Sequence, residues 1–133
     1  YGHLTLSELA DLFEASAPKI DAIIHNFPQP IISQFVMDAV THEQDMRSAL
    51  GMPGGRDSKA VEVGVGFFLN LFEANDPPLF DALVNTRVSQ WDVLRSVTGR
   101  RTVEQMNALG LDGEAIALHF PGSPFSLPKE AVE

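Results

Sequence analysis

The sequence of 133 residues contains no cysteine. A disulfide framework and a zinc site built from thiolates are therefore both excluded. If the protein performs thiol chemistry, the sulfur has to come from a substrate or a cofactor. A bound metal has to use histidine, aspartate or glutamate ligands instead.

Long apolar runs are also missing, because none approaches the roughly 18 residues that a membrane-spanning helix needs. Near the N-terminus there is no basic segment followed by an apolar one, as a secretory signal would have. We therefore expect a soluble, cytoplasmic protein of one domain that does not interact with a membrane. The chain starts with Tyr1 rather than methionine, and we expect it to be a fragment of a longer protein.

Positive charge is scarce: 9 lysine and arginine residues stand against 18 aspartate and glutamate residues, and the formal net charge is −9. A nucleic-acid partner is disfavoured, because it needs a positive surface and aromatic platforms, and the chain has one tryptophan and one tyrosine. Four of the nine basic residues nevertheless fall within fifteen positions, namely Arg87, Arg95, Arg100 and Arg101. This concentration is the candidate region for binding an anion.

Helical periodicity dominates the first half of the chain. A helix capped by Thr5 or Ser7 is predicted up to about residue 24, with an interruption at Pro18. A second helix is predicted from residue 31 to residue 50, where Gly51 provides a C-terminal cap. We call this segment the motif helix.

A third helix is predicted after Asp57 or Ser58, and it is apolar on nearly all sides, so it should be buried. Gly64 and Gly66 in this helix would let another helix approach closely. The segment "DPPL" ends it.

The C-terminal part gives weaker signals. Residues 82–88 are predicted as a short strand, followed by a helix that stops at Gly99. Thr102 and Gln105 have the spacing of a capping box, and the short helix after Thr102 closes at Gly110. The proline-rich tail is expected to pack as an extended strap or to fray.

These elements predict a mainly α fold. Residues 1–78 form a helical bundle that contains the motif helix, and residues 79–133 form a small α/β extension. We expect both parts to pack as one globular unit.

The motif helix carries an unusual set of polar residues within the segment "FVMDAVTHEQDMRSALG". Asp38, His42 and Asp45 have spacings of four and three residues, which place them on one side of a helix. They can bind a divalent metal through the imidazole and a carboxylate, or the carboxylates can orient the histidine in a hydrogen-bond cluster. Glu43 can form an ion pair with Arg47 one turn later, or support a metal site from outside.

The other histidines offer no such pattern. His3, His25 and His119 have no acidic or histidine partner at ligand spacing, and surface or capping roles are expected for them. Arg100 and Arg101 can recognise a carboxylate of a thiol cofactor or substrate. They can equally form ion pairs, or interact with the C-terminal end of the preceding helix.

Two segments resemble a known family. "MDAVTHEQDMRSALGMPGGRDS" and "DVLRSVTGRRTVEQMNALGLDGE" are similar to the motif helix and the C-terminal signature of the mycothiol-dependent maleylpyruvate isomerase family. This is a largely actinobacterial branch of the DinB-like four-helix bundles. The resemblance implies a DinB-like bundle, of which three long helices are visible here and a fourth is missing.

The resemblance also implies a chemistry. In that family an acid and a histidine four residues apart bind a divalent metal, usually zinc, and Asp38 and His42 occupy those positions. Asp45 and Glu43 are then expected to support the ligands from the second layer. The family's third ligand is a histidine on an earlier helix, and no segment before residue 35 matches that helix.

Two functions follow as hypotheses. The first is a metal-dependent transferase or isomerase that uses mycothiol or a similar small thiol on an electrophilic small molecule. The second is a noncatalytic bundle that binds a small molecule or another protein and has a degenerate metal site. Because three long helices leave one side of a four-helix bundle open, residues outside this chain or a partner, as in a homodimer, should cover that side.

Overall fold

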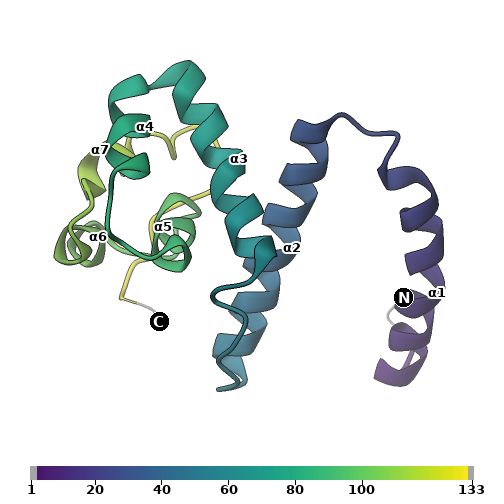
Figure 1. Ribbon diagram of the computed structural model, residues 1–133. Coiled ribbons are helices and arrows are strands. Elements are labelled where there is room, and N and C mark those ends of the chain that lie inside the picture. The colour runs from purple at the N-terminus through teal and green to yellow at the C-terminus, as the bar shows by residue number, and fades with distance from the viewer. Residues whose placement is uncertain (1–2, 132–133) are drawn as a thin grey trace. The chain divides into compact units, whose positions relative to one another are not determined.

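The computed structural model describes residues 3–131, and every regular element within that range is a helix. The mainly α prediction is confirmed (Figure 1). The chain divides into two compact units, residues 1–32 and residues 33–133. None of the helices in the described range is both long and apolar enough to cross a membrane.

The first unit contains α1 (Leu6–Ile24). Thr5 and Glu8 form a capping box at its start: the Glu8 amide donates to the Thr5 hydroxyl and the Thr5 amide donates to the Glu8 carboxylate. The helix continues through Pro18, so the interruption predicted at this proline does not divide it. No residue of α1 is buried.

The second unit begins within α2 (Gln29–Ala49), the motif helix. It continues with α3 (Lys59–Asn75), which begins at the N-cap Ser58 as predicted. The short helices α4 (Pro77–Val84), α5 (Gln90–Val97), α6 (Val103–Leu109) and α7 (Gly113–Ala117) follow. We expected the boundary between the bundle and the C-terminal extension to fall between residues 78 and 79, but this point lies inside α4.

The predicted strand at residues 82–88 is wrong, because α4 extends to Val84 and residues 85–88 are not in a strand. The reason lies in "DPP", which ends one helix and also starts the next. Asp76 accepts a hydrogen bond from the Leu79 amide as an N-cap, and the two prolines occupy the first helical positions, where they are favoured. Leu79 and Leu83 are then one turn apart and both buried.

The core of the second unit is built around α3. Its buried residues pack with apolar side chains from α2, α4, α5 and the end of α7; the cluster includes Met37, Val40, Val61, Val65, Phe68, Phe72, Leu79, Leu83, Leu94, Val97, Ile116 and Phe120. Gly64 allows a close approach: a Cβ there would lie 3.2 Å from Leu94 and 3.5 Å from the Cα of Met37. Gly66 has no neighbour within 4 Å of such a Cβ, so the prediction of close packing holds for the first glycine only.

Candidate functional site

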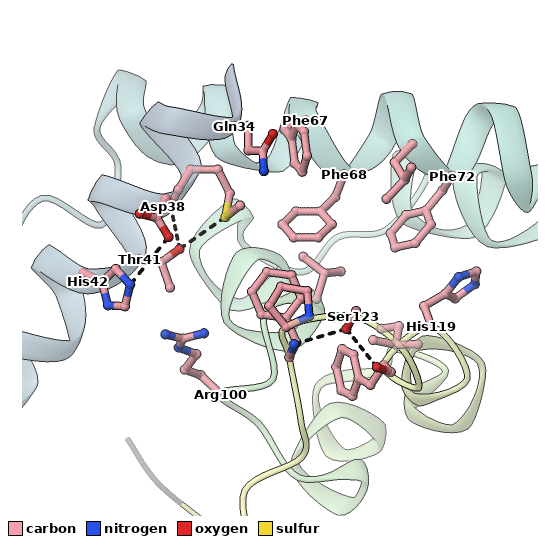
Figure 2. Close-up of a pocket in the computed structure, with 17 residues that line it drawn as sticks. Gln34, Asp38, Thr41, His42, Phe67, Phe68, Phe72, Arg100, His119 and Ser123 are labelled. Atoms are coloured by element: carbon pink, nitrogen blue, oxygen red, sulfur yellow. Dashed lines mark hydrogen bonds and ion pairs between the residues drawn. The ribbon is translucent and has the colours of Figure 1, made fainter. Parts of the chain in front are cut away.

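A pocket of about 370 Å³ opens in the second unit between α2, α3, the end of α5, α7 and the C-terminal segment. Most of the residues that line it are apolar, and five of the 17 are phenylalanines (Figure 2). Phe68 lies at the centre, with ring centroids 5.3 Å from Phe67, 6.2 Å from Phe72 and 5.7 Å from Phe125. The same phenylalanine side chains therefore belong both to the hydrophobic core and to the wall of the pocket.

The C-terminal segment forms one side of this pocket through Ser123, Pro124 and Phe125. The Ser123 hydroxyl donates to the Phe120 carbonyl and accepts from the Phe125 amide, which holds the turn in place. The segment passes directly over Gly99, whose φ is +72° and whose added Cβ would collide with the Ser126 carbonyl. A glycine is required there on both counts. The tail thus packs as an extended strap, one of the two outcomes expected for it.

Asp38 and His42 both line the pocket, and they lie on the same side of it (Figure 2). The His42 Nε2 is 3.5 Å from the Asp38 carboxylate. Their side chains are 69% and 63% exposed, so the pair is solvated and is not a buried hydrogen-bond cluster. The structure brings together two of the three residues that we grouped on this helix.

The third residue, Asp45, bonds elsewhere. Its carboxylate accepts hydrogen bonds from Arg95 Nη1 at 2.9 Å and from Arg100 Nη2 at 2.7 Å. Burial alone would raise the pKa of Asp45, but the hydrogen bond and charge of Arg100, together with those of Arg95, outweigh burial and hold this pKa below its usual value. Asp45 therefore joins α2 to Arg95 in α5 and to Arg100 just after it, and within the described residues none of its hydrogen bonds or ion pairs goes to His42.

The three arginines Arg95, Arg100 and Arg101 have different surroundings. The Arg95 side chain is 5% exposed, and its guanidinium lies 5.2 Å from the ring centre of Trp91. Arg100 is 20% exposed and lines the pocket, whereas Arg101 pairs with Asp92 at 3.2 Å and does not line it. Of the two arginines predicted to bind an anion, only Arg100 is placed to reach a ligand in this pocket.

Glu43 forms the ion pair that the i,i+4 spacing predicted. Its carboxylate accepts from Arg47 Nε at 2.8 Å, and Arg47 Nη2 lies 2.7 Å from the same oxygen. Both side chains are substantially exposed, and neither lines the pocket. A role for Glu43 in supporting a metal site stays a prediction.

One pair at the pocket was missed by sequence reasoning. His119 lines the end of the pocket opposite His42, and its Nε2 lies 2.9 Å from the Asp76 carboxylate (Figure 2). The hydrogen bond from His119, together with the Leu79 amide, lowers the pKa of Asp76. The His119 ring also packs against Phe72, with centroids 4.9 Å apart. No local pattern could reveal this pair, because its members are 43 residues apart.

A complete metal site is not formed by the part of the chain that the structure describes. No three histidine, aspartate or glutamate side chains in it, His3 included, come together in a way that could hold an ion. A catalytic zinc typically has three protein ligands and one open position. Asp38 and His42 would supply two, so these residues alone do not fit a zinc centre.

Comparison of the chain with protein-family models, with curated proteins and with solved structures found no match.

Proposed function

We propose that the protein binds a small amphipathic molecule in the pocket lined by Phe67, Phe68 and Phe125. The observation that carries this proposal is a mainly apolar cavity that has Asp38, His42 and Arg100 at one end and His119 at the other. Its volume of about 370 Å³ falls within the range of known small-molecule sites, which run from roughly 300 to 1,000 Å³. This corresponds to the second of the two functions expected from the sequence.

The two ends differ in chemistry, which would orient a ligand. One end carries Asp38, His42 and Arg100, and the other carries His119. The phenylalanine rings between them offer only apolar contact. A ligand with an apolar body and one polar group would gain from burying the body there while keeping the polar group at one end.

The test uses naphthoate and its neutral analogue naphthamide as probes, with binding followed by calorimetry and by NMR of the pocket residues. Gln34 is an exposed residue at the pocket wall, and Gln34→Trp should block the opening without disturbing the core. We expect at least one probe to bind the native protein, to shift the signals of Phe67 and Phe68, and to bind Gln34→Trp at least tenfold more weakly.

Ala39→Trp provides the matched control, since Ala39 is an exposed residue of the same helix that does not line the pocket. This variant should bind the probe like the native protein. If neither probe shifts a pocket residue, or if both variants behave alike, the proposal is wrong.

A metal-dependent thiol transferase or isomerase remains a second candidate. The observation in its favour is that Asp38 and His42, the two residues that the resemblance assigns to the metal, lie 3.5 Å apart on the rim of this same pocket. A metal bound there would lower the pKa of a coordinated thiol. The remaining ligands would have to come from the thiol, from water or from residues outside the described range.

Zinc binding tests this candidate directly. Titration of the purified protein with zinc, with and without a small thiol, should show one stoichiometric site that His42→Ala removes. His25→Ala is the matched control, because His25 lies in the first unit. Equal zinc affinity in the native protein and in His42→Ala would exclude the assigned ligands.

A further inference from the structure

The helix α1 carries an apolar stripe that the described residues of the first unit do not bury. Leu6 and Phe13 are 86% and 78% exposed, and Ile20 and Ile23 are each about half exposed. Besides α1, this unit contains only the short segments on either side of the helix and the first residues of α2. Helices in proteins are stabilised mainly by the packing of such an apolar face. The stripe therefore requires a partner from outside the first unit.

The stripe has a repeat of seven residues. Two rows make it up: Leu6, Phe13 and Ile20, and three positions after each of these Leu9, Ser16 and Ile23. Two helices can pack along a common seam when apolar residues recur in this way. Pro18 lies on the opposite side of the helix from both rows and does not obstruct the seam. The pattern therefore predicts that the partner is another helix.

A second copy of α1 fits the stripe when it runs in the antiparallel direction. Placing Phe13 opposite Ser16 of the copy brings the other members of the rows together as two further pairs, Leu6 with Ile23 and Leu9 with Ile20. Each layer then combines a large ring with a small side chain or two aliphatic side chains, as close packing requires. A parallel pair would instead set Phe13 against Phe13 and Ser16 against Ser16.

The polar groups at this seam are also compatible with pairing. The Ser16 hydroxyl donates to the Phe13 carbonyl of its own helix at 2.7 Å, so it can be buried without losing a hydrogen bond. Lys19 flanks the stripe and is the only lysine or arginine among residues 1–32. In the antiparallel pair it lies beside Glu8 of the copy. The Thr5 amide and hydroxyl both donate to Oε2 of Glu8, which leaves Oε1 to accept from Lys19.

We propose that α1 is an interface between two copies of this chain, in which the two α1 helices pack antiparallel along the stripe. This inference does not depend on the proposed function of the pocket. A lipid surface fits α1 less well, because helices that lie on membranes are rich in lysine and arginine on their polar face, whereas α1 has four acidic residues and one lysine.

The first experiment measures the mass of the full chain by sedimentation equilibrium over a range of concentrations. We expect a dimer that dissociates on dilution. Ile20→Glu puts a charge into two symmetry-related layers and should weaken dimerisation at least about tenfold. Glutamate favours a helix at least as well as isoleucine does, so a loss of helix would not explain this result. Ala22→Glu is the matched control, because exposed Ala22 lies away from the stripe, and it should dimerise like the native chain.

The second experiment determines the direction of the helices. Because the chain has no cysteine, each introduced thiol is the only one present. In the antiparallel pair the two copies of residue 9 lie roughly 16 Å apart along the seam, as do the two copies of residue 20. Leu9→Cys and Ile20→Cys should therefore form little disulfide-linked dimer separately, but should form it readily when the two variants are mixed. Efficient linkage within either variant alone would show a parallel pair and overturn the proposed arrangement.

Two further results would overturn the interface itself. A chain that stays monomeric at every concentration would show that the stripe is covered by the second unit of the same chain or by a different protein. Equal dimerisation of Ile20→Glu and Ala22→Glu would show that the copies associate through another surface. Neither result would affect the pocket proposal, which is tested by probe binding.

Discussion

Two carboxylates on α2 illustrate how differently the same residue type can be used. Asp38 faces a partner one turn away on its own helix, at 3.5 Å and largely in water. Asp45, two turns later, binds Arg95 and Arg100 at 2.9 and 2.7 Å, 50 and 55 residues further along the chain. The first pair lies within one helix, whereas the second fixes the position of α5 and the segment after it relative to α2.

The difference lies in burial. A pair in water gains little, because the solvent already stabilises both charges. A guanidinium that is 5% exposed, as in Arg95, depends on its counterion, because the cost of removing it from water must be offset within the protein. The sequence pattern drew attention to Asp45, Arg95 and Arg100, but it did not predict that they pair with one another.

The largest effect is expected for Asp45→Asn. This variant removes the negative charge that contacts both Arg95 and Arg100, and we expect a loss of about 3 kcal/mol in the free energy of unfolding. That value is at the low end for breaking a buried pair, because Asp45 itself is 38% exposed. Urea unfolding of the native protein and the variant measures the change. A loss below about 1 kcal/mol would show that the pair is no more important than a surface ion pair.

The stability of the same variant at acid pH tests whether Asp45 stabilises the fold in its ionised form. Because the pKa of Asp45 is lower in the folded protein than the ordinary value of 3.8, its ionised form stabilises the fold above that ordinary value. The contribution disappears as the pH falls through the lowered pKa. The difference in stability between native protein and Asp45→Asn should therefore be constant near neutral pH and shrink in acid below about pH 4. A difference that grows in acid would contradict the assignment.

Local patterns in the sequence predicted what local forces decide. The Thr102 and Gln105 capping box, the left-handed Gly110 that ends α6, and the pairing of Glu43 with Arg47 all appear in the structure. Each depends on residues a few positions apart, so spacing alone was enough. The strand at residues 82–88 failed because a second local signal, "DPP" as a helix start, was interpreted only as a helix end.

Contacts between distant segments had no such signal. The spacing of three residues grouped Asp45 with His42, although the partner of Asp45 is decided by which side of α2 meets α5. His119 appeared to lack an acidic partner, because Asp76 is 43 residues away and also acts as a helix cap. Three residues of the candidate site were therefore predictable, namely Asp38, His42 and Arg100, while the aromatic side chains of the pocket were brought together only by the fold.

The smallest effect is expected for Glu43→Gln, which removes an exposed i,i+4 pair on the same helix as Asp45. Such pairs contribute roughly 0.3 kcal/mol, and glutamine has a helix propensity close to that of glutamate, so unfolding should barely change. Whatever loss is measured should vanish at 1 M salt, where the screening length falls to about 3 Å. The loss in Asp45→Asn should largely survive the same salt, because buried charges are screened much less. If both losses respond equally to salt, the arginines that hold Asp45 are as accessible to ions as Arg47 is, and the contrast between the two carboxylate sites disappears.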